Sequence, residues 1–189
     1  MRSLAFLLIL LVPFSASAGF VEVGASANYR SSGYDKSNFV ESIAYTASLS
    51  YYFWEMCAWE LNYTTGYSKQ VTKGPLAIDP KETVEDNIQL VSLDLVLSFA
   101  GRQDPFRPYV KFGGGYLKKE RFRQVNNGNV DPISTQEGMV PSAGLGFAIG
   151  VTKELSIKLG LDAWTSPLGK KDQPLIVDYA GRAGISWMF

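Results

Sequence analysis

The amino-acid types in this chain argue against catalysis. It has 18 Lys and Arg, 18 Asp and Glu, one cysteine and no histidine. Histidine is the side chain best suited to general-base chemistry near neutral pH, and it is a frequent zinc ligand. An acyl-transfer triad would therefore need an unusual substitute here. We expect a protein that is not an enzyme, has no cofactor or metal site, and carries no net field that would attract nucleic acid.

A second group of residues could act through charge. Seven ionisable side chains each fall opposite the apolar face of a segment that alternates with period two. They are Glu22, Glu60, Asp94, Lys111, Lys158, Asp162 and Arg182. If this face lines a narrow interior, isolated charges there would be costly, so we expect the seven to pair and hydrogen-bond as one lumen network.

The alternating segments that must position these charges number eight. They cover residues 20–30, 42–53, 57–68, 88–99, 108–118, 139–151, 155–164 and 176–189. Each is close to or above the roughly 9–11 residues that a tilted strand needs to cross the hydrocarbon. Between them, long connections at 31–41, 69–87, 119–138 and 165–175 alternate with short ones at 54–56, 100–107 and 152–154.

This rhythm of long and short connections is typical of an outer-membrane barrel with long external loops and tight periplasmic turns. We therefore predict an all-β fold, an eight-stranded antiparallel transmembrane β-barrel in an up-and-down meander, with both termini on the periplasmic side. A soluble β-sandwich or lipocalin-like barrel would also alternate, but it does not explain the rhythm.

The composition of the two faces indicates which one meets lipid. The polar face is diluted by Gly, Ser, Ala and Thr, small residues that fit the interior of an eight-stranded barrel. Among them are Gly144, Gly146 and Gly150. These three miss the spacing of a dinucleotide fingerprint and lie in a strand pattern, so we expect them to pack in the lumen. The apolar face carries aromatic residues near the strand ends, as interfacial girdles do.

The first 18 residues resemble no part of a barrel. A basic start at Arg2 is followed by an apolar run, Leu4 to Pro13, and by Ser15-Ala16-Ser17-Ala18. This order is typical of a cleavable signal peptide. We predict a signal peptide at 1–18 and a single barrel domain at 19–189. A retained signal anchor is the alternative, although the run is shorter than the roughly 20 residues of a spanning helix.

Several motifs resemble those of a known family. The ending Ile185-Ser186-Trp187-Met188-Phe189 resembles the assembly signal of bacterial outer-membrane barrels, carried by Ile185, Trp187 and Phe189. The stretches Pro108 to Tyr116 and Ala143 to Phe147 resemble strands of small barrels of the OmpA/OmpX-like superfamily. The resemblance implies the outer membrane of a Gram-negative bacterium and insertion by the β-barrel assembly machinery. Because the chain ends at Phe189, we expect only the barrel domain of that superfamily.

The resemblance leaves two functional hypotheses. In the first, side chains plug the lumen and four extracellular loops give a structural or surface-interaction role. In the second, the barrel is a narrow, gated pore for ions or small solutes. We also expect outer-membrane lipid and lipopolysaccharide as partners, and a monomer, because a closed barrel leaves no free edge.

A basic cluster bears on the lipopolysaccharide expectation. Lys118, Lys119, Arg121 and Arg123 gather where the fifth segment would leave the membrane. Their side chains could bind lipopolysaccharide phosphates. An ordinary solvated loop, with Glu120 interleaved, would have the same composition.

Overall fold

The chain folds as a closed β-barrel. The structure, a computed structural model, describes residues 19–35, 38–73, 80–126, 128–165 and 177–189. The predicted signal peptide at 1–18 and nearly all of the predicted connection at 165–175 lie outside the described residues. Among the residues described, no helix is long and apolar enough to cross a membrane.

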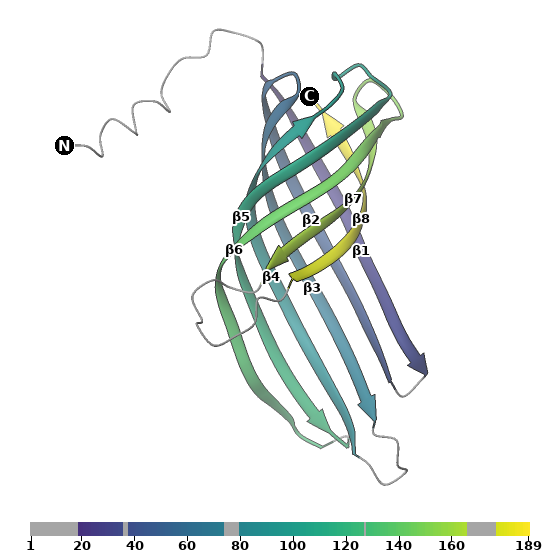
Figure 1. Cartoon of the computed structure of the whole chain (residues 1–189), viewed down its shortest axis with the longest axis vertical. Helices are drawn as coiled ribbons and strands as arrows, with labels where there is room; N and C mark the ends of the chain where they lie inside the picture. The colour runs from purple at the N-terminus through teal and green to yellow at the C-terminus, as the bar shows by residue number, and fades with distance from the viewer. Residues whose placement is uncertain (1–18, 36–37, 74–79, 127, 166–176) are drawn as a thin grey trace, which may run out of the picture.

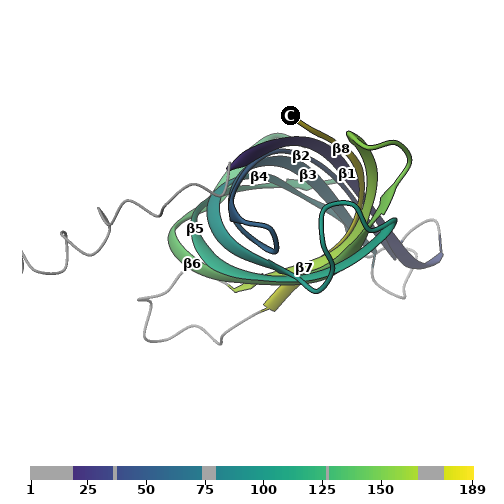
Figure 2. The same cartoon turned by 90° about the horizontal axis from the view of Figure 1, so that it is seen from above.

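Eight antiparallel strands follow one another around the barrel in chain order, and the last pairs with the first. Figure 2 shows them as a ring around a single lumen. The predicted eight-stranded meander is confirmed. The strands are β1 (Phe20–Asp35), β2 (Asn38–Trp54), β3 (Cys57–Lys73), β4 (Lys81–Ser98), β5 (Phe106–Val125), β6 (Val130–Gly150), β7 (Leu155–Thr165) and β8 (Val177–Met188).

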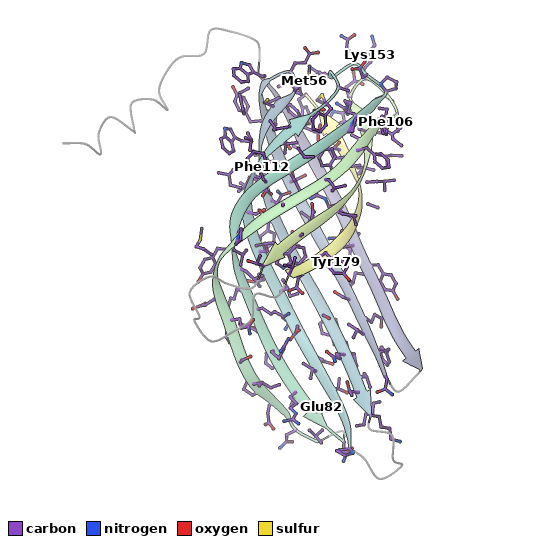
Figure 3. The ribbon with its side chains drawn as sticks, in the orientation of Figure 1. Met56, Glu82, Phe106, Phe112, Lys153 and Tyr179 are labelled. Atoms are coloured by element: carbon purple, nitrogen blue, oxygen red, sulfur yellow. The ribbon has the colours of Figure 1, made fainter. Side chains whose placement is uncertain are left out.

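The two faces of the barrel have inverted polarity, as the sequence predicts. Leu49, Leu93 and Leu145 are about half exposed on the outer surface, whereas Glu22 and Asp94 are 1% and 2% exposed. Figure 3 shows Phe112 projecting from the outside of the wall. Alternation therefore places bulky apolar residues on the outside of the barrel and buries a set of charged residues, including Glu22 and Asp94, inside it.

Six strands are longer than the sequence predicts. β1 to β6 hold 16 to 21 residues each. The predicted connections at 31–41, 69–87 and 119–138 are therefore wrong as loops, because most of their residues belong to strands. In the sequence, apolar residues mark one face of these strands only over the predicted segments. Beyond that point charged residues continue the ladder, as in the Lys69–Glu85 pair, with 3.5 Å between nitrogen and oxygen.

β7 and β8 are shorter, with 11 and 12 residues. Figure 1 shows them ending part of the way along the barrel, while the other strands continue away from the end that carries the C-terminus. We call that end the terminal end and the opposite one the far end. The far-end extension comprises the strand residues beyond the level of Asn28 and its neighbours in register, namely 28–35, 38–44, 66–73, 81–88, 119–125 and 130–136.

Candidate functional site: the charge network in the lumen

Glu60, on β3, is the centre of the lumen network. Its carboxylate is 3% exposed and lies among three cations from three other strands. Its oxygens are 3.3 Å from Lys111 Nζ, 3.6 Å from Arg182 Nη2 and 3.8 Å from Lys158 Nζ. The hydroxyl of Ser50 also donates to Glu60 Oε2, at 3.2 Å. One carboxylate thus joins groups from opposite sides of the barrel.

Asp162, on β7, shares two of these cations. Its carboxylate is 3.0 Å from Lys111 Nζ and 3.2 Å from Arg182 Nε. Lys111 reaches Asp162 by passing over Gly144 on β6, the strand between theirs, where an added Cβ would lie 2.5 Å from Asp162 Oδ1 and 2.8 Å from Lys111 Cε. A side chain at this position would have to displace the end of the Asp162 or Lys111 side chain. The predicted close packing is confirmed for Gly144 and Gly146 but not for Gly150, where the nearest atom to an added Cβ would be 3.7 Å away.

Glu22 and Lys158 form a second ion pair on the terminal side of Glu60. The Tyr52 hydroxyl donates to Glu22 Oε2 at 3.3 Å. The Lys158 ammonium also lies 5.9 Å from the ring centroid of Tyr109, within the range of a cation–π contact. Two tyrosines, both with inward-facing rings, therefore bound the network on this side.

Asp94 differs from the other six predicted residues. It is 2% exposed, yet no lysine or arginine of the described chain lies at ion-pair distance from it. Asn62 Nδ2 donates to it at 2.9 Å, and the hydroxyls of Ser92 and Ser142 donate at 3.0 and 2.5 Å. Neutral donors thus satisfy this carboxylate, while the other six residues form one connected set of ion pairs.

Arg107 is a lumen residue that the sequence analysis missed. It is 7% exposed, and its Nη2 donates to the Ser156 hydroxyl at 2.5 Å. With it, the buried cations Arg107, Lys111, Lys158 and Arg182 equal in number the lumen carboxylates Glu22, Glu60, Asp94 and Asp162. The available signal was parity, because Arg107 is two residues from Tyr109 and four from Lys111 on the inward face. Arg107 was missed because it falls in the predicted short connection at 100–107.

Apolar layers flank the network on both sides. Toward the terminal end, Tyr52, Ala58, Val96 and Tyr109 form a buried cluster with Phe20 against it. Toward the far end, a second cluster consists of Leu90, Leu117 and Val140, packed with Ile88 and Trp164. The sequence predicts an inward face of polar and small residues, so these two inward apolar layers differ from the expectation. They pack beside the charge network on its two sides.

The four basic residues predicted to face lipopolysaccharide lie on strand β5, not in a loop. Alternation divides them between two faces. Lys119 and Arg121 both contact the buried carboxylate of Asp86, at 3.3 and 2.7 Å. Lys118 lies 2.7 Å from Glu120. The fourth, Arg123, lies 2.8 Å from a carboxylate oxygen of Glu82.

Asp86 is a second residue that the sequence analysis missed, because it fell in a predicted loop. Its side chain is 12% exposed and is held by cations from the neighbouring strand. Arg121 donates to it through both Nε and Nη2, at 2.7 and 3.1 Å. This bidentate pair ties β4 to β5 in the far-end extension.

Of the residues of the predicted assembly signal, Ile185 and Trp187 lie on the outside of β8 and Phe189 directly follows the strand. Ile185, Trp187 and Phe189 are all exposed. The strand closes the barrel against β1, and the Phe189 amide donates to the Val21 carbonyl at 2.8 Å. The intervening Met188 points inward and is 2% exposed.

Known proteins share this architecture. No curated protein matches the sequence. The N-terminal β-barrel domain of Pseudomonas aeruginosa OprF aligns with a TM-score of 0.55 and 18% identity, covering 90% of this chain and 97% of that one. The outer membrane protein OprG from the same organism aligns with a TM-score of 0.57 and 15% identity, covering 90% and 95%. At these identities the likeness is one of fold.

The sequence itself carries the family assignment. Residues 3–169 match the family described as outer membrane protein beta-barrel domain. This match spans most of the chain, and the eight-stranded meander with an apolar exterior agrees with it. The chain therefore belongs to the outer membrane protein β-barrel domain family, and it is a protein of the bacterial outer membrane.

Proposed function

We propose that this chain is an outer-membrane barrel whose lumen is plugged by side chains, and that it serves a structural or surface-interaction role through its extracellular loops. The observation that carries the proposal is the position of Glu60, whose carboxylate meets Lys111, Lys158 and Arg182 across the lumen at 3.3 to 3.8 Å. Side chains that meet from opposite walls leave little room between them for a water column.

The energetics of such a network support a lasting plug. Buried charges are costly unless they are paired and hydrogen-bonded, and removing one partner of a buried pair typically costs about 3–5 kcal/mol. The apolar layers around Tyr109 and Leu90 add to the isolation of the network from water. Opening a path would require several of these pairs to separate together.

A narrow gated pore is the second candidate. The observation that favours it is that Glu60 and Asp162 both contact Lys111 and Arg182. Each cation can therefore move toward one carboxylate and away from the other without losing every partner. Such an exchange could open a path for an ion without exposing an unpaired buried charge.

Single-channel conductance in planar bilayers distinguishes the two candidates. The plugged barrel predicts no stepwise conductance for the unmodified chain, and none for a conservative control, Arg182→Lys. Arg182→Ala removes the guanidinium that joins Glu60 to Asp162 and is the variant most able to leak. Discrete conductance of the unmodified chain that increases in Arg182→Ala would reject the plug and establish the pore.

Two features support a non-catalytic role at the cell surface. The chain contains no histidine, the residue that general-base chemistry near neutral pH favours. The far-end extension carries ion pairs of partly exposed residues, such as Lys69–Glu85 and Arg123–Glu82. In this proposal the extension stands above the bilayer, where its basic side chains meet lipopolysaccharide phosphates and its loops meet a partner.

Orientation can be tested by labelling intact cells with a membrane-impermeant maleimide. Asn129→Cys introduces an exposed thiol at the far end, and Lys153→Cys introduces one in an exposed turn at the terminal end. Figure 3 labels Lys153 at that end. The proposal predicts that only Asn129→Cys is labelled, above the background of Cys57 measured in the unmodified chain. Labelling of Lys153→Cys alone would reverse the orientation and reject a role for the far-end loops.

A further inference from the structure

A cavity of about 310 Å³ lies inside the barrel on the far side of the charge network. Small or hydroxyl-bearing residues of β2 and β3 form one wall. Leu90, Ile88 and Trp164 line the cavity from the opposite side. Its volume lies at the lower end of the range of about 300–1,000 Å³ typical of ligand pockets. The cavity therefore offers both room and apolar surface to one small ligand.

The same cavity reaches the outer surface of the barrel. Tyr29, Leu161 and Tyr179 line it, although these side chains are 64%, 54% and 62% exposed on the lipid-facing side. Figure 3 shows Tyr179 about half-way along the barrel, where β8 begins. Residues that line an internal cavity and also face outward mark a place where the wall is open.

The opening coincides with the end of the pairing between β1 and β8. Their register stops at Ala27↔Ala183, although both strands extend beyond it. Past this point the Asn28 side chain spans the gap. In the amide orientation that satisfies its surroundings, its nitrogen donates to the Gly181 carbonyl at 2.7 Å. At this point a side-chain hydrogen bond takes the place of the backbone hydrogen bonds between β1 and β8.

In the orientation proposed above, on which this inference rests, the height of the opening places it in the outer half of the bilayer. Strands tilted by about 40° rise roughly 2.5 Å per residue along the membrane normal. Counted from the start of β1 at Phe20, Ala27 is then more than half-way across a hydrocarbon band about 25 Å tall. The cavity therefore communicates with lipid chains in the leaflet nearer the far end.

We propose that the chain binds a single-chain amphiphile of the outer leaflet, whose alkyl tail passes between β1 and β8 into this cavity. The tail contacts Leu90, Ile88 and Trp164, and its burial there supplies the binding free energy. The polar head stays at the opening beside Tyr29 and Tyr179, whose rings suit the interface between lipid and water. The small volume of the cavity favours one tail over the two of a phospholipid.

Trp164 provides a direct probe of this site, because it is the tryptophan that lines the cavity. The other three tryptophans are replaced in a Trp54→Phe, Trp59→Phe, Trp187→Phe background. The protein is reconstituted in bilayers, and a fatty acid brominated along its chain is titrated as a quencher. The proposal predicts saturable quenching of Trp164 fluorescence. A linear response, or none, would overturn it.

Two substitutions on the same strand distinguish quenching of Trp164 by fatty acid bound in the cavity from quenching by fatty acid in the surrounding bilayer. Ala44→Phe fills the cavity, whereas Ala47→Phe adds the same ring to the lipid-facing side of β2. Ala44→Phe should weaken the apparent affinity by about tenfold or more, which corresponds to lost burial of two methylene groups. Ala47→Phe should leave the affinity unchanged. Equal affinities in the two variants would overturn the proposal.

Two further arms complete the test. Ala180→Phe fills the cavity from β8 and replaces Ala44→Phe if that variant fails to show heat-modifiable mobility on gels. A phospholipid with brominated chains, present throughout the bilayer, tests the source of the tail. Strong quenching by the phospholipid that Ala44→Phe abolishes, without saturable binding of the fatty acid, would assign the cavity to a bilayer lipid and reject the single-chain ligand.

Discussion

Arg182 and Glu60 form an ion pair across the interior of the barrel, with 3.6 Å between Nη2 and Oε1. Their strands, β8 and β3, are not neighbours in the sheet. The pair therefore connects opposite walls and does not merely reinforce one ladder. Because Arg182 also contacts Asp162, at 3.2 Å, the same guanidinium links the two carboxylates that share Lys111.

The central carboxylate should be the most sensitive position of the network. Glu60→Gln keeps the shape of the side chain but leaves Lys111, Lys158 and Arg182 without their shared anion. We expect the free energy of unfolding to fall by about 3–5 kcal/mol, measured by urea titration in lipid vesicles with heat-modifiable mobility as the readout.

Glu85→Gln is the matched control, because Glu85 pairs with Lys69 where both side chains are more than a third exposed. Its effect should stay within about 0.5 kcal/mol. Adding Lys111→Met to Glu60→Gln removes one of the three cations that lost their contact with Glu60, although Lys111 still contacts Asp162, and should recover part of the loss. A double variant that is less stable by the sum of the two single effects would show that Glu60 and Lys111 are not coupled.

A side chain at Gly144 should disturb the network, because an added Cβ would lie within 2.8 Å of atoms of both Asp162 and Lys111 and 3.1 Å from the Leu161 carbonyl oxygen. Gly144→Ala should destabilise the barrel by about 1–3 kcal/mol, as overpacking of a core does. Gly150→Ala is the control, since the nearest atom to its Cβ would be 3.7 Å away. Equal unfolding midpoints for the two variants would contradict the close crossing of Lys111.

Asp86 should stabilise the far-end extension and not the barrel beneath it. Asp86→Asn removes the charge that Lys119 and Arg121 share, and the partial exposure of Arg121 reduces the cost to about 1–2 kcal/mol. We expect faster amide hydrogen exchange at residues 81–88 and 119–125, with no change at residues 92–97. An effect of equal size in both regions would show that the extension and the barrel unfold as one unit.

The part of the fold that the sequence predicts is the part where residues alternate between an apolar and a polar face. Alternation predicted eight strands and placed Glu60, Lys111 and Arg182 on one inward face. The prediction failed where a strand lacks either the apolar outward face or the polar inward face. In the extension, Asp86 and Arg121 continue the strands without an apolar face to mark them. In the lumen, Leu90 and Tyr109 are apolar on the polar face.

The contacts of the network needed three-dimensional information. Alternation places Asp94 and Glu60 on the same inward face. It does not predict that neutral donors surround Asp94 whereas cations surround Glu60. These partners depend on the register between neighbouring strands, because the register determines which inward side chains lie at the same level of the lumen. The open seam beside Asn28 was also beyond the sequence, because it depends on where the register of β1 with β8 stops.

The whole account depends on inverted polarity, and spin-label accessibility along β2 tests it most directly. Labels at residues 45–50, placed singly in a Cys57→Ala background, sample both faces of one strand. We predict that odd positions, exposed in the structure, collide with lipid-soluble oxygen, and that even positions, which face the lumen, are protected. Protected odd positions with oxygen-accessible even ones would contradict the inward direction of the charged residues.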